Sequence, residues 1–172
     1  MSVIYCDNDN DILLPSLQLA DDFSPIIDAE LSVSFGSIDT KGVITGATNA
    51  TPIVITSAAH GLTTGDTVVI SGVEGNLAAN GVHAVTVIGA NSFSLDDSVG
   101  DGDFDADSSA TWYVGVDEAT DLAMSYSSSA KRYLAVVPGT APFVAGKKYI
   151  RIVNASNYNV HWEETVVAQV RR

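Results

Sequence analysis

The 172-residue sequence contains one cysteine, Cys6, which excludes an internal disulfide and a cysteine-based metal cluster. Long hydrophobic runs are also missing. Residues 133–138 form one of the longest, far below the roughly 20 residues needed to cross a bilayer. Residues 1–10 lack a basic region followed by an apolar core, so we expect no secretory signal. These absences predict a protein without disulfides and without membrane segments.

Basic residues are scarce and unevenly distributed. The net charge is −13, which argues against a protein whose main role is to bind nucleic-acid phosphates. Residues 1–130 hold nineteen acidic residues and one basic residue, whereas residues 131–172 hold two acidic and seven basic residues. The basic cluster is either a solvated surface or an interaction face that meets acidic surfaces of other copies or of neighbouring proteins. Its members are Lys131, Arg132, Lys147, Lys148, Arg151, Arg171 and Arg172.

If the cluster is an interaction face, its charges should govern approach and register between subunits. Exposed ion pairs contribute only about 0 to 1 kcal/mol each. We therefore expect that reversing Lys147, Lys148 and Arg151 to glutamate slows assembly without unfolding the chain.

Apolar and polar residues alternate in many short runs, with the period of a half-buried strand. Leu31, Val33 and Phe35, for example, alternate with two serines. No stretch shows a sustained apolar period of 3.6 residues, so α-helices are not expected. Short strands separated by turn residues are typical of sandwiches and barrels. Strands are predicted at 31–35, 52–56, 67–71, 82–88, 92–95, 111–116, 122–127, 132–137, 149–153, 160–163 and 165–170.

The composition changes in the middle of the chain. Residues 43–110 contain no Tyr, Trp, Lys or Arg, whereas the flanking parts hold most of the aromatic residues. Because aromatic side chains supply much of the buried area of a small domain, we predict one domain interrupted by another. The predicted fold is all-β. Residues 1–42 and 112–172 would form an immunoglobulin-like β-sandwich, and residues 43–111 an inserted small β-barrel.

Residues 57–75, SAAHGLTTGDTVVISGVEG, place a histidine and an aspartate among glycines, as either a reactive site or a pair of tight turns would. His60 precedes Gly61 and Asp66 follows Gly65, which fits two turns whose residues tolerate positive φ. A hydrolase needs a nucleophile and a base within reach, but the serines here lack the GxSxG pattern. We interpret these four residues as structural, expect His60→Ala to cost little stability, and assign no catalytic residue.

An acidic segment follows at residues 96–107. An EF-hand calcium loop needs glycine at its sixth position and glutamate at its twelfth, where this sequence has Ala106 and Trp112. A looser calcium site is the alternative to a flexible, solvated connection. We predict no metal and no cofactor. The weak candidate ligands are Asp101, Asp103, Asp105 and Asp107.

Residues 50–95 carry the series HGL, GD, ISGV, NG and FSL. In this order and spacing the stretch resembles the small β-barrel module related to the first catalytic-cysteine half-domain of ubiquitin-activating enzymes. That module recurs in bacteriophage tail and other virion proteins. The resemblance does not imply ubiquitin chemistry, because Cys6 lies outside the module.

The flanking sequence is similar to small phage virion proteins with an immunoglobulin-like plan. The similarity lies in DILLPSLQLADDFSPIIDAELSVSF, AMSYSSSAKRYLAVVP, FVAGKKYIRIV and HWEETVVAQVRR. Such genes resemble those found near portal and head-to-tail adaptor genes.

Together the two resemblances imply a non-enzymatic structural component of a bacteriophage particle. The expected place is the head-tail neck or the tail, where copies form a ring and contact portal, adaptor or tail proteins. The protein would then be located in the virion, after assembly in the host cytoplasm, with neither a membrane nor a specific nucleic acid as partner. The alternative is a capsid decoration or fibre-like binding module whose inserted barrel contacts a host surface glycan.

Overall fold

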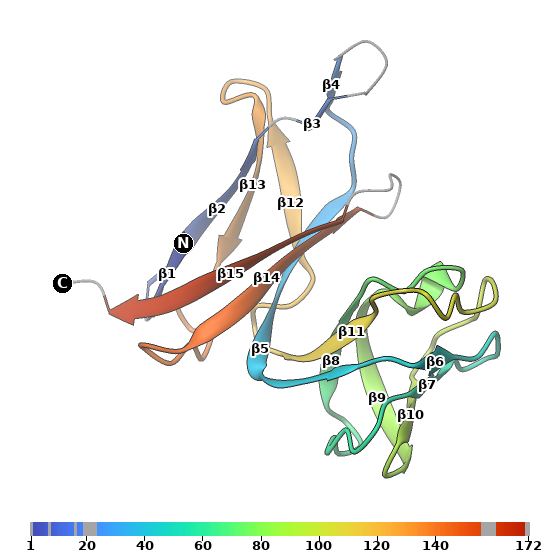
Figure 1. The fold of residues 1–172 in the computed structure, drawn as a ribbon. Helices are drawn as coiled ribbons and strands as arrows, with labels where there is room; N and C mark the ends of the chain where they lie inside the picture. Colours follow the sequence, from blue (N-terminus) through green and yellow to red (C-terminus); the bar gives the residue numbers. More distant parts are fainter. Residues whose placement is uncertain (1, 7, 16, 19–23, 156–160, 171–172) are drawn as a thin grey trace. The chain divides into compact units, whose positions relative to one another are not determined.

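The computed structural model describes residues 2–6, 8–15, 17–18, 24–155 and 161–170. The chain divides into two compact units, which we name the outer unit, residues 1–35 with 116–172, and the inner unit, residues 36–115 (Figure 1). The described residues form strands and one 3₁₀ turn, η1 (Leu77–Ala79), which confirms the predicted all-β class.

The outer unit is a two-layered β-sandwich, as predicted (Figure 1). In the first layer the strand order is β1, β15, β14 and the N-terminal part of β5, with β1 parallel to β15. In the second layer β13 lies between β12 and β2 and is antiparallel to both. β12 links the layers, because its first half pairs with β5 and its second half with β13. The strands are β1 (Ser2–Cys6), β2 (Asn10–Pro15), β5 (Leu31–Val43), β12 (Leu122–Ser127), β13 (Arg132–Val137), β14 (Lys148–Ala155) and β15 (His161–Val170), with a short ribbon of β3 (Leu17–Gln18) and β4 (Pro25–Ile26).

The core of the outer unit lies between the two layers. Alternation along each strand sends every second side chain inward. In β13, Tyr133, Ala135 and Val137 are buried, while the residues between them point outward. The Tyr133 hydroxyl donates to the carbonyl of Ile26 and accepts from the N–H of Ala29, both at 3.0 Å, so the buried phenol is fully hydrogen-bonded. Other core residues include Ile4, Cys6, Ile12, Val33, Phe35, Met124, Phe143, Tyr149, Val153, Val166 and Ala168.

The inner unit is a small β-barrel. Residues 36–43 pair with β11 (Thr111–Gly115), and residues 46–47 pair with β7 (Val54–Thr56), which closes the ring of strands. The closure is visible in two backbone hydrogen bonds of 2.9 Å, from Ile44 N–H to Ala110 O and from Thr45 N–H to Thr56 O. From β5 onward the strand order is β11 (Thr111–Gly115), β8 (Thr67–Ser71), β9 (Gly81–Gly89), β10 (Ser92–Leu95), β7 (Val54–Thr56) and β6 (Gly46–Ala47).

The inner unit begins inside β5, at residue 36, and ends with β11, at residue 115. Composition predicted an insertion from 43 to 111, so the inner unit is longer at both ends than expected. β5 continues as one strand across the division, so no turn residue marks it. Trp112, which composition assigned to the outer domain, is 1% exposed in the inner core. Its indole N–H donates to Ser57 Oγ at 2.8 Å, and a Cβ on Gly42 would lie 2.6 Å from the indole nitrogen.

The chain leaves and returns to the outer unit at neighbouring backbone positions. The N–H of Val116 donates to the carbonyl of Phe35, and the N–H of Phe35 donates to the carbonyl of Ala119, each at 2.8 Å. The inner unit is therefore an insertion between two hydrogen-bonded points of the sandwich, where extra chain is well tolerated.

We predict that replacing residues 36–115 with a short Gly/Ser linker leaves the outer unit folded, because Phe35 and Val116 are already adjacent. The deletion removes Trp112, so near-UV circular dichroism in the tryptophan region then reports Trp162 alone. The expected result is a retained near-UV signal with cooperative unfolding. A chain that keeps strand signal but loses the Trp162 band would show that the outer core depends on the inner unit.

Candidate functional site

His60 is buried and holds a turn together. Its Nδ1 accepts the N–H of Leu62 at 3.0 Å, so Nε2 carries the proton and donates to the carbonyl of Gly89 at 2.8 Å. The ring packs edge-on against Phe93, with centroids 5.2 Å apart. Gly61 has φ +66°, where a glycine is favoured. His60 thus joins the turn to the end of β9 and to the barrel core.

The second turn is closed by Asp66. Its carboxylate accepts the N–H of Thr63 at 2.8 Å and the Thr63 hydroxyl at 2.9 Å. Gly65 has φ +97°, and its N–H donates to the carbonyl of Val85 on β9. Of the four residues interpreted as turn residues, His60, Gly65 and Asp66 make contacts that shape the barrel, and Gly61 supplies the positive φ of the first turn.

The acidic segment packs against the loop after β8. A Cβ on Gly75 would lie 1.9 Å from the carbonyl oxygen of Asp103, so only glycine permits this approach. The Asp101 carboxylate accepts the N–H of Ala78 at 3.1 Å, and Phe104 packs against the inner core. The segment is thus anchored at several points, unlike the solvated connection that the sequence suggested.

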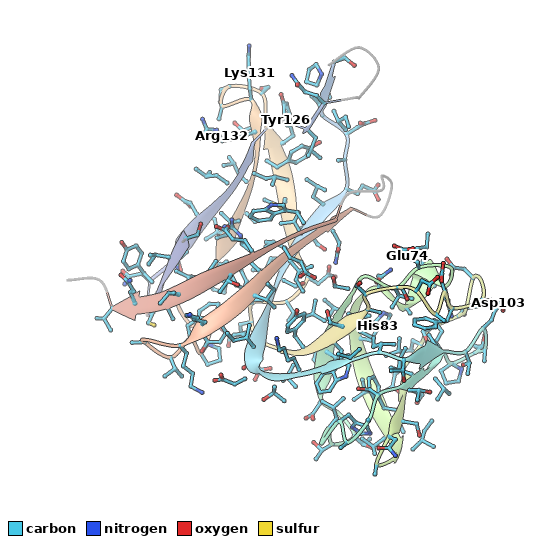
Figure 2. The ribbon with its side chains drawn as sticks, viewed as in Figure 1. Glu74, His83, Asp103, Tyr126, Lys131 and Arg132 are labelled. Carbon is cyan, nitrogen blue, oxygen red and sulfur yellow. The ribbon has the colours of Figure 1, made fainter. Side chains whose placement is uncertain are left out.

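Among the described residues, no group of three His, Cys, Asp or Glu side chains is arranged to hold a metal ion. The four candidate aspartates are exposed, and two of their carboxylates accept hydrogen bonds from nearby backbone. The Asp105 carboxylate, for example, accepts the N–H of Asp107 at 2.9 Å. Figure 2 shows Glu74 and Asp103 at the same side of the inner unit.

The basic residues described by the structure do not share one face. Lys131 and Arg132 lie at the β12–β13 turn (Figure 2), at one end of β13. The chain leaves the other end of β13 before it reaches Lys147 and Lys148, which lie beside the C-terminal part of β15. Arg171 and Arg172 lie outside the described residues.

Arg151 is engaged within the outer unit. Its guanidinium forms an ion pair with Glu164 and lies 4.7 Å from the ring centroid of Trp162. The Glu164 carboxylate also accepts the hydroxyl of Ser2. Burial lowers the pKa of Arg151, an effect that Glu164 opposes. Charge reversal here would break internal contacts, so Arg151→Glu is expected to affect stability as well as assembly, contrary to the expectation from sequence.

The sequence pattern did not single out this contact of Arg151, Glu164 and Trp162. The signal was present, because β14 and β15 are consecutive antiparallel strands that place Arg151 directly opposite Glu164. Predicting it required the register of the hairpin, which the turn-forming residues of 156–160, SNYNV, do not fix by themselves.

A shallow groove of about 880 Å³ lies on the outer unit. It is lined by residues of β1, β15 and the turn before β14, and it contains none of the residues predicted from sequence as a site. The lining residues are Tyr5, Ala145, Gly146, Val167, Ala168, Gln169 and Val170. In the part of the chain that the structure describes, no helix has the length and apolar character that crossing a membrane requires.

Comparison with known proteins yields no match to a family model and no match to a curated protein. The two resemblances described above therefore rest on the motifs themselves.

His60→Ala should cost about 2–4 kcal/mol of unfolding free energy, because Leu62 N–H and Gly89 C=O lose their partner and Phe93 loses its ring contact. This reverses the expectation from the sequence. The matched control is Gly61→Ala, which adds a methyl into open space at positive φ and should cost only about 1–2 kcal/mol. Urea unfolding measures both. A His60→Ala variant as stable as the wild type would refute the structural role.

His83 on β9 should make stability depend on pH. Burial lowers its pKa from 6.5, an effect opposed by hydrogen bonds to the backbone of Asn80 and Ala79. Unfolded chains then bind the proton more readily than folded ones, so stability is complete above pH 6.5 and falls as the pH drops through the lowered folded pKa. Thermal unfolding between about pH 8 and pH 5 should show a smaller loss for His83→Gln. Equal losses for the two proteins would contradict the assignment.

Proposed function

We propose that this chain is a non-enzymatic structural component of a bacteriophage particle, placed at the head-tail neck or in the tail. There it assembles with copies of itself and with adjacent virion proteins. The observation that carries the proposal is the motif series of residues 50–95, which resembles a module of phage tail and other virion proteins. These motifs together build one closed barrel, inserted into a sandwich.

The way each motif is used supports a structural role. His60 of HGL and Asp66 of GD close turns, and Ile70 of ISGV is fully buried. In NG, the Asn80 side chain accepts the N–H of Val73 at 2.9 Å and donates to its carbonyl at 2.8 Å. FSL supplies Phe93 and two further residues of β10 to the barrel. The polar groups of the series are thus committed to backbone contacts, which favours a scaffold over a reactive site.

The alternative is a capsid decoration or fibre-like module that contacts a host glycan through the barrel. Such contacts commonly use an exposed aromatic face. In the inner unit Phe93, Trp112 and Tyr113 are buried, and Phe104 is half-buried against the core. The neck or tail function therefore has the better support.

Mass spectrometry of purified particles tests the proposal by counting copies of this chain. About six or twelve copies per particle, as expected for a ring on the tail axis, would support the neck or tail. Hundreds of copies would support capsid decoration. Absence of the chain from purified particles would overturn the proposal, and binding of host polysaccharide by the purified protein would favour the glycan-binding alternative.

A further inference from the structure

The outward surface of the second layer of the sandwich has an apolar centre. Leu13 on β2 and Leu134 on β13 are directly opposite each other, and Val136 follows on the same side of β13. Leu13 is 46% exposed and Val136 is 54% exposed. We name this surface the β2–β13 face. It consists of Asp11, Leu13, Ser125, Arg132, Leu134 and Val136.

This composition departs from the usual pattern of a solvated sheet. The inward side chains of the same strands already form the core, and the outward positions of such a layer are normally polar. Here two exposed aliphatic side chains and the half-buried Leu134 form a cluster, beside the small side chain of Ser125. A flat cluster of this kind with polar surroundings is typical of a protein contact surface.

The charges at the two ends of the face are opposite in sign. Arg132 is exposed at one end, and it points away from the inward Tyr126 (Figure 2). Asp11 is exposed at the other end, opposite Val136. Arg132 and Val136 are four positions apart along β13, which corresponds to about 13 Å. Within one molecule the two charges are therefore too far apart to form an ion pair.

We propose that two copies of this chain associate through the β2–β13 face around a two-fold axis. An antiparallel arrangement brings Leu13, Leu134 and Val136 against the same residues of the second copy. The same rotation brings Arg132 beside the partner's Asp11, and Asp11 beside the partner's Arg132. Because the surface is self-complementary, the same ion pair can form at both ends of the dimer, as an isologous contact requires.

This contact is separate from the proposed function. An isologous contact closes at two copies and cannot by itself generate a ring, so ring contacts would use other surfaces. The proposed dimer concerns the purified chain alone. If the purified chain stays monomeric, the copy number in particles is still open. If the copy number contradicts the proposed function, the dimer is still open.

The affinity should be modest, because the face is small. Sedimentation equilibrium of the full chain from roughly 10 µM to 1 mM should show a monomer–dimer equilibrium. Val136→Ser removes an exposed apolar side chain from the centre and should weaken dimerisation about tenfold or more. Because Val136 lies outside the core, far-UV circular dichroism should be unchanged.

Charge reversal gives the sharpest test. Arg132→Glu alone and Asp11→Lys alone each place like charges together at both ends of the dimer, so each variant should dimerise about tenfold more weakly. A mixture of the two variants should form a heterodimer in preference to either homodimer, because opposite charges then meet at both ends. Native mass spectrometry separates the three species.

Lys148→Glu is the matched control, since it makes the same charge change at an exposed site far from the β2–β13 face. This variant should leave the dissociation constant of the dimer unchanged. The proposal is overturned if the wild-type chain stays monomeric over the whole concentration range, as it would if a different protein occupied this face. It is also overturned if the mixed charge variants show no preference for the heterodimer, or if Lys148→Glu weakens the dimer as much as Arg132→Glu.

Discussion

The backbone pairing of Phe35 with Val116 and Ala119 is the constraint on which the arrangement of this chain depends. It brings the two ends of an 80-residue segment, residues 36–115, to adjacent positions. Because buried backbone groups must be hydrogen-bonded, the sandwich can be interrupted only where such a pairing survives. Phe35 also contributes to the core, where its ring packs edge-on against Phe143 with centroids 5.4 Å apart. The outer unit therefore closes its own core without residues from the insertion.

The inner unit obtains its shape from a few buried polar side chains as well as from its apolar core. Asn76 is fully buried, donates to the carbonyl of Thr48 at 3.0 Å and accepts the N–H of Asp101 at 3.2 Å. Asn80 closes the neighbouring loop on Val73. These amides satisfy backbone groups that short strands leave unpaired. The acidic segment is thereby held in place, so its carboxylates are presented by ordered backbone.

The basic residues show that a charge cluster in the sequence need not form one surface in the folded protein. In the sequence, seven basic residues crowd into the last 42 positions and suggest one positive surface. Antiparallel strands reverse direction at every turn, so residues about 15 positions apart can lie at opposite ends of the sandwich and in different layers. Lys131 and Lys148 are separated in this way, and Arg151 pairs with Glu164. Charge complementarity is then a property of individual faces, such as Arg132 and Asp11 on the β2–β13 face, and the net charge of a segment does not describe it.

Local patterns by themselves determined the all-β class, most strand positions and the turn roles of His60 and Asp66, because side-chain alternation and positive φ act over a few residues. They missed β1 and β2, whose alternation is weak, and the inner-core position of Trp112. Only the tertiary structure decided where the units divide, since β5 passes through the boundary without a change in local pattern. It also decided that His60 is buried and that Arg151 is paired. Those outcomes depend on contacts between residues distant in the chain, and strand register, which local sequence does not encode, determines such contacts.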